Sequence, residues 1–182
     1  MTSGLGVPDW ACMSEERRAH VERVAALLRQ WAEAMRVPAA EWERWLRAAY
    51  LHDALRDADP AWLERLVPDS WGIASLRHGP AAARLAQEHG ETDPGVLAAV
   101  RYHSVGHAGW DQAGRMLYLA DYLEPGRRFR DAERQAWAAR VPRDPAGVLR
   151  EVAADRLSWV LHSGRPLVEE SVAFWNALVA SP

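Results

Sequence analysis

The segment Trp42–Asp53, WERWLRAAYLHD, decides the fold class of this chain. Its apolar residues recur at the spacing of one face of an α-helix, at Trp42, Trp45, Leu46, Ala49 and Tyr50. The segment then ends on a histidine and an aspartate, two side chains that bind divalent metals. It therefore predicts an amphipathic helix with a pair of candidate metal ligands at its end.

The same helical pattern continues on both sides of this segment. Ser14 followed by two glutamates is typical of a helix start, and Pro38 disfavours helix at the residue before it. Further helices are predicted over 60–67, 81–88, 92–103 and 112–123, with two more within 145–180. No stretch alternates apolar and polar residues as a strand would. We therefore expect an all-α fold, with a flexible tail over 1–13, one domain over 14–182 and a solvated connection over 127–143.

Composition excludes several classes of protein. The 182 residues are 49% hydrophobic and 26% charged, with a net charge of −3, so we expect no nucleic-acid partner. No apolar run approaches the ~20 residues that span a bilayer, and no signal peptide is visible, so no membrane partner is expected. The single cysteine, Cys12, fits a reducing cytoplasm.

Candidate metal ligands are spread along the chain in a fixed order: His20, His52, Asp53, His78, His103 and Asp121. Each is weak evidence alone, since a histidine on an apolar helix face is more often a hydrogen-bonded core residue. Asp121 lies on an apolar face, where a carboxylate is costly unless it is paired or bound to metal. Glu124, one turn later, could accept a hydrogen bond from a ligand histidine. Together they predict a centre for two metals, which could hold a water and a phosphate.

Five short motifs carry a resemblance to a known family: Arg18–His20, Tyr50–Asp53, His78–Pro80, Arg101–Gly106 and Leu119–Arg127. With them the chain resembles the HD-domain superfamily of metal-dependent phosphohydrolases. Within that superfamily it is similar to the YqeK family, which cleaves diadenosine tetraphosphate symmetrically. The resemblance covers residues 17–130, and Leu119–Arg127 is its most specific part.

The resemblance implies an HD-domain helical bundle with a buried centre of two divalent metals, iron or alternatively manganese. His20, His52, Asp53 and Asp121 would hold one metal. Asp53, His78 and His103 would hold the other, and a metal-activated hydroxide would attack an inner phosphorus to give two ADP.

Other residues are expected to contact the substrate. Guanidinium binds phosphate bidentately, which favours Arg56 and Arg127, with Arg101 as a weaker third. Ser104 could bond a phosphate oxygen, and His107 could donate a proton. Asp53, His107 and Arg56 are therefore the expected catalytic residues. Tyr122 or Trp110 could stack on a base, although both residue types are usually packing residues.

Three alternatives stay open from the sequence. The chain could be an HD phosphohydrolase for a nucleoside monophosphate or a cyclic nucleotide. It could be an inactive HD domain that only binds nucleotide, or a helical scaffold with scattered histidines. A homodimer is compatible with the 10 tryptophans but is not required by them.

Overall fold

The computed structural model describes residues 5–127 and 129–180. Helices account for all the regular structure in these ranges, and no strand occurs there, which confirms the all-α prediction. The helices are α1 (Glu15–Ala34), α2 (Ala39–His52), α3 (Pro60–Leu66), α4 (His78–Glu88), α5 (Pro94–Tyr102), α6 (Gln112–Leu123), α7 (Asp131–Arg140), α8 (Pro145–His162) and α9 (Glu169–Ala180), with a 3₁₀ turn, η1 (Ala74–Leu76). None of the helices described is long and apolar enough to cross a membrane.

Helix α1 begins after Ser14 as the sequence predicts, but it ends at Ala34, before the predicted end near Val37 and Pro38. The Ser14 side chain accepts a hydrogen bond from the Arg17 amide, which caps the first turn. At the other end Arg36 adopts a left-handed conformation (φ 54°), and the Val37 amide bonds back to the carbonyl of Ala32. This turn reverses the chain and lays α2 against α1.

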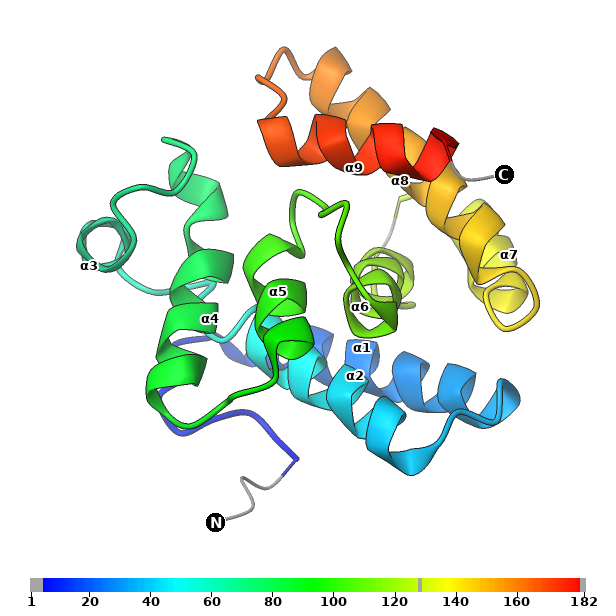
Figure 1. Cartoon of the computed structure of the whole chain (residues 1–182), viewed down its shortest axis with the longest axis horizontal. Coiled ribbons are helices and arrows are strands. Elements are labelled where there is room, and N and C mark those ends of the chain that lie inside the picture. The colour runs from blue at the N-terminus through cyan, green and yellow to red at the C-terminus, as the bar shows by residue number, and fades with distance from the viewer. Residues whose placement is uncertain (1–4, 128, 181–182) are drawn as a thin grey trace.

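Helix α2 is central to the fold, since it packs against α1, α4, α5 and α6. Its buried face combines the large Trp45 with the small, fully buried Ala48 and Ala49. Small side chains let neighbouring helices approach closely. In Figure 1, α2 lies in front of α1 and beneath α5 and α6, so its C-terminal end points into the molecule.

Helices α4 and α5 form a closely packed pair, which is visible as two adjacent green helices in Figure 1. Gly79 permits this approach. A Cβ added there would lie 2.9 Å from the carbonyl oxygen of Arg101 and 3.2 Å from Cε1 of His103. The glycine after His78 therefore brings the start of α4 against the end of α5.

The prediction of a solvated connection over 127–143 was wrong, because α7 lies there. Trp137 on this helix is buried, and Arg134 is buried although it is charged. The Arg134 guanidinium donates to the carbonyls of Tyr122 and Glu124 at the end of α6. The segment has few apolar residues because the hydrogen bonds of Arg134 supplement the two core side chains, Trp137 and Val141, that attach it.

The N-terminal segment makes contacts that the sequence did not predict. Of the expected flexible tail over 1–13, residues 1–4 lie outside the described residues. The Cys12 amide bonds to the carbonyl of Ala54 at 2.7 Å, and the Cys12 carbonyl accepts from the Asp57 amide. Val7 and Trp10 pack against the core. The segment thus lies along the loop that follows α2.

Helices α8 and α9 pack together at one end of the molecule, with α8 also against α6 (Figure 1). Phe174 of α9 is buried against Trp110 and Tyr118, with ring centroids 5.3 Å apart in both pairs. Trp110 also donates its ring N–H to the carbonyl of Ala98. Trp110 is therefore a packing residue, as tryptophans usually are.

Candidate metal centre

Three histidine rings in the centre are held by the same kind of local hydrogen bond. His52, His78 and His103 each donate Nδ1–H to the backbone carbonyl three residues earlier, at 2.7, 3.0 and 2.8 Å. The carbonyl can only accept, so in a neutral ring the opposite nitrogen, Nε2, carries the lone pair. All three side chains are buried. These hydrogen bonds turn three Nε2 lone pairs toward the interior, where helices α2, α4 and α5 meet.

His78, His103 and Asp53 converge on one point. The two Nε2 atoms lie 3.0 Å apart, and they lie 3.2 and 3.5 Å from Oδ1 of Asp53. Burial lowers the pKa of His78, which favours the neutral ring that binds metal. Two imidazoles and one carboxylate thus form a three-ligand group.

His20, His52 and Asp53 form a second group, and Asp53 belongs to both. Nε2 of His20 lies 3.8 Å from the other carboxylate oxygen of Asp53, Oδ2, and Nε2 of His52 lies 3.7 Å from it. Asp121 joins this group, with Oδ1 3.2 Å from Nε2 of His20 and 4.0 Å from Nε2 of His52. One carboxylate oxygen of Asp53 therefore faces each group, as a bridging ligand requires.

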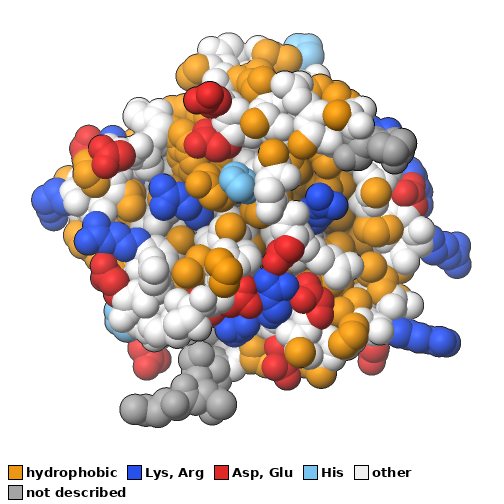
Figure 2. Space-filling view, in the orientation of Figure 1, with side chains coloured by type: hydrophobic (Ala, Val, Ile, Leu, Met, Phe, Trp, Pro, Cys, Tyr) orange, Lys and Arg blue, Asp and Glu red, His pale blue; other side chains and the backbone are white. Residues whose placement is uncertain are grey.

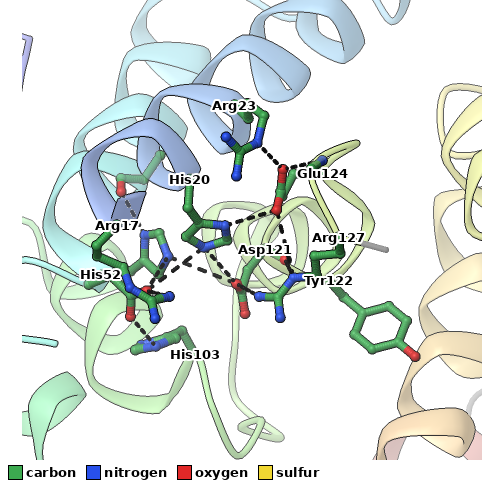
Figure 3. A network of polar contacts seen from close by, with 12 residues as sticks. Arg17, His20, Arg23, His52, His103, Asp121, Tyr122, Glu124 and Arg127 are labelled. Carbon is green, nitrogen blue, oxygen red and sulfur yellow. Dashed lines mark hydrogen bonds and ion pairs between the residues drawn. The ribbon is translucent and has the colours of Figure 1, made fainter. Parts of the chain in front are cut away.

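His20 is oriented by a carboxylate instead of a carbonyl. Figure 3 shows its ring between Asp121 and Glu124, and Nδ1 lies 3.1 Å from Oε1 of Glu124. Glu124 in turn accepts from Arg23 at 2.5 Å and from the Gly126 amide at 2.7 Å. The expected contact between Glu124 and a candidate ligand histidine is therefore present.

Charged neighbours shift the pKa values of His20 and Asp121. Burial lowers the pKa of His20, but the carboxylates of Asp121 and Glu124 outweigh burial and raise it to about 9. Burial would raise the pKa of Asp121, yet Arg127 and His20 hold it well below its usual range. His20 would have to lose this proton to bind a metal, so metal binding there should release a proton.

His52 gives the sharpest test of whether these residues fit a metal. Burial lowers its pKa to about 4, so the ring is neutral. Its Nε2 is buried and has no hydrogen-bond partner in the part of the chain that is described. An orphaned buried acceptor costs about 1–3 kcal/mol, and metal ligation removes that cost. The set of imidazole and carboxylate donors fits two divalent transition metals.

A model of the HD domain family matches residues 17–126. The chain belongs to the HD-domain family. The match spans α1 to the end of α6, so it contains every residue of the two ligand groups. Helices α7, α8 and α9 lie beyond it.

Three relatives of this HD protein are each named symmetrical bis(5'-nucleosyl)-tetraphosphatase. The Halalkalibacterium halodurans protein is 26% identical over 140 residues, which cover 72% of this chain and 74% of the relative. The Bacillus subtilis protein is 29% identical, over 69% of this chain and 63% of the relative. The Staphylococcus aureus protein is 30% identical, over 63% of this chain and 62% of the relative. The chain thus spans less than two thirds of the last two relatives.

A solved structure shares the fold over most of both chains. It is described as a predicted HD superfamily hydrolase involved in NAD metabolism from Clostridium acetobutylicum. The TM-score is 0.80 at 21% identity, over 93% of this chain and 92% of that one. The shared fold extends beyond the HD match and includes most of the C-terminal helices.

The residues expected to contact substrate lie at different distances from the centre. Arg127 is next to it, with Nη2 2.7 Å from Oδ1 of Asp121, and Ser104 Oγ lies 3.1 Å from Nε2 of His103. Arg56 is half-buried, and its charge helps to lower the pKa of His78. These three therefore surround the HD centre.

Arg101 and His107 lie farther out. Arg101 is exposed, with its guanidinium 5.6 Å from the ring centroid of Tyr102. His107 stacks on the same Tyr102 ring at 4.4 Å and accepts the Gly109 amide at Nδ1. No contact of either residue with a candidate metal ligand is among those described. The structure therefore does not bring them together with the candidate ligands through any described contact.

Two arginines at the centre were missed by the sequence analysis. Arg17 donates to Oδ2 of Asp53 at 2.9 Å, and Arg156 of α8 lies 3.4 Å from Oδ2 of Asp121. Arg17 could have been found, since it precedes His20 by three residues and so shares its helix face. Arg156 gave no signal, because it lies 35 residues from Asp121 and outside every motif.

Proposed function

We propose that this HD protein is a metal-dependent symmetrical bis(5'-nucleosyl)-tetraphosphatase. It would add water to an inner phosphorus of diadenosine tetraphosphate, break the central P–O–P bridge and release two ADP. The observation that carries the proposal is the pair of ligand groups that share Asp53, in a chain whose relatives bear that name. A cytoplasmic location belongs to the same proposal, which is compatible with a homodimer but does not require one.

The chain's own residues would hold the metals and the substrate. His20, His52, Asp53 and Asp121 would hold one divalent metal, and Asp53, His78 and His103 the other, with iron favoured over manganese. When bound, two such ions lower the pKa of water and take up charge on phosphoryl oxygens. Arg127 and Arg56 would grip the polyphosphate, with Arg101 as a weaker third.

Two smaller roles complete the proposal. Ser104 would donate its hydroxyl to a phosphate oxygen. His107 would be the proton donor from its imidazolium form, through Nε2, the ring nitrogen that the Gly109 amide does not contact.

The test is turnover of diadenosine tetraphosphate by the purified protein, with products separated and metals measured on the same sample. We expect ADP as the only nucleotide product and about two metals per chain. Products of AMP and ATP would contradict symmetrical cleavage. Two metals without turnover would favour an HD phosphohydrolase for another nucleotide, or an inactive nucleotide-binding domain.

Asp53→Asn separates the shared ligand from general folding. We expect loss of bound metal and of activity with the helical circular dichroism retained, because the amide keeps the shape but loses the anionic oxygen. Asp131→Asn, at the exposed start of α7, is the matched control and should keep both properties. Normal turnover in Asp53→Asn would refute the two-metal proposal.

A further inference from the structure

A cavity of about 690 Å³ lies beside the candidate metal centre, and most of its lining residues lie beyond the HD match. Its walls come mainly from α6, the loop that follows α6, and α8, with Ser104 and Val105 after α5 and Ser171 of α9. It meets the centre at Ser104, Arg127 and Arg156. Its volume falls within the ~300–1,000 Å³ of typical small-molecule sites.

Most charged groups around the cavity are already paired. Arg127 is bound to Asp121, while Asp155 accepts from both Tyr122 and Arg130. The lining holds the three arginines Arg127, Arg130 and Arg156 against the single carboxylate of Asp155. Because Arg127 and Arg130 are already bound to carboxylates, the lining arginine most open to an anionic ligand is Arg156, whose contact with Asp121 is 3.4 Å long.

Arg156 stands at the boundary between cavity and metal centre with its donors weakly engaged. Its two described hydrogen bonds, to Oδ2 of Asp121 and to the carbonyl of Ser104, are both 3.4 Å, beyond the usual N–H···O range. A guanidinium has five N–H donors. The ring of Tyr118, with its centroid 4.3 Å away, holds the guanidinium in place. Arg156 is thus positioned but has donors left for a phosphate.

Two aromatic side chains on the same cavity are open to solvent. Phe129 is 45% exposed and Trp159 is 58% exposed, whereas the neighbouring Tyr122 is buried. Arginines lie near both rings, Arg134 at 4.8 Å from the Phe129 centroid and Arg165 at 5.0 Å from that of Trp159, and a nucleobase can stack on a ring that keeps an exposed face. Phosphate donors on one side and aromatic rings on the other match one nucleotide.

We propose that α8 completes the substrate site. Arg156 binds the phosphates at the metal centre, and the cavity beside Phe129 and Trp159 takes the nucleoside of the same nucleotide unit. The inference rests on the proposed function only for the identity of the full substrate. It assigns helix α8, which the HD match does not include, to substrate binding.

The test measures binding to the metal-loaded full chain by calorimetry, with AMP and ribose 5-phosphate as probes that differ only in the base. Arg156→Ala should weaken both probes about tenfold, and Arg156→Lys should recover part of the loss. Trp159→Ala should weaken AMP about tenfold and leave ribose 5-phosphate unchanged. The control is Arg150→Gln, which removes a positive charge from α8 beside a different cavity. It should leave the binding of AMP and of ribose 5-phosphate unchanged.

Turnover supplies a second readout that a merely structural role would not give. For diadenosine tetraphosphate we expect Arg156→Lys and Trp159→Ala to raise KM more than they lower kcat, with metal content unchanged. Unchanged AMP binding in both Arg156→Ala and Trp159→Ala would overturn the proposal. Loss of metal in Arg156→Lys would also overturn it, since Arg156 would then only support Asp121.

The two proposals fail separately. If wild-type protein does not cleave diadenosine tetraphosphate, the proposed function fails, whereas the AMP measurements still decide whether α8 binds a nucleotide. If turnover is normal in every variant, the proposed function stands and the role of α8 is refuted.

Discussion

At the scale of single residues, the centre depends on how each imidazole is turned. Three histidines use the carbonyl three residues earlier, which costs no partner from elsewhere in the fold. His20 lies in the second turn of α1, where the backbone carbonyls accept hydrogen bonds from the amides of the helix. Its ring is therefore oriented by a side chain at the end of α6. Glu124 therefore orients a ring that local structure cannot orient.

Glu124→Gln should weaken metal binding at the His20 group about 10- to 100-fold, because the ring loses its anionic acceptor. The group of His78 and His103 does not contact Glu124 and should keep its affinity. Titration of metal-free protein with Mn²⁺ would show one weakened site and one unchanged site. Glu133→Gln, an exposed glutamate on α7, is the control. Equal affinities for wild type and Glu124→Gln would mean that packing alone orients His20.

At the scale of elements, aspartates start several helices and also join them. Asp93 and Asp111 accept hydrogen bonds from backbone amides at the starts of α5 and α6. Both also bind Arg44 of α2, at 2.7 and 2.5 Å. One arginine thus connects two helix starts to the central helix.

Asp93→Asn should remove a pH-dependent part of stability. Hydrogen bonds from Arg44 lower the pKa of Asp93 to about 2, below its usual 3.8. Between these values the unfolded chain binds more protons, so stability is present above pH 4 and is lost as pH falls toward 2. The contribution is about 1–2 kcal/mol, reduced from the full shift because the side chain is partly exposed.

Urea unfolding of wild type and Asp93→Asn from pH 6 to pH 2.5 tests this expectation. The difference in the free energy of unfolding should be constant above pH 5 and shrink below pH 4. A difference that is the same at every pH would show that Asp93 acts through hydrogen bonding alone, and not through its charge.

At the scale of the whole molecule, five helices meet at the candidate metal centre. Its residues come from α1, α2, α4 and α6 and from the residues directly after α2 and α5. The core around them is apolar, so the carboxylates and imidazoles are buried together. On the face drawn in Figure 2, acidic and basic side chains are interleaved, so the surface there offers no continuous basic field.

Removal of metal should therefore lower the melting temperature of the whole protein. Metal at 100 times its Kd stabilises by about 2.7 kcal/mol, which for this size of chain shifts Tm by about 5–10 °C. Calorimetry with and without a chelator would measure the shift. Asp53→Asn should show no response to metal, and Asp131→Asn the full response. A wild-type Tm that is independent of metal would contradict a stoichiometric metal site.

Much of the helical architecture could be predicted because its signals are local. Ser14 marks the start of α1, and the period through Trp42 and Tyr50 marks α2. Caps and periodicity act over one or two turns, so they are visible in sequence. The prediction for the segment over 127–143 was wrong, because its apolar residues are too few to mark a helix. Hydrogen bonds from Arg134 to carbonyls at the end of α6 help to hold α7 in place.

By itself the sequence determined the fold class, the HD motifs and the order of the candidate ligands, because each depends on neighbouring residues in the chain. Only the tertiary structure decided which atoms face one another: Oδ1 of Asp53 toward His78, and Oδ2 toward His20. It alone brought Arg156 to Asp121 across 35 residues. Such contacts depend on how helices pack, and packing is set by the whole core at once.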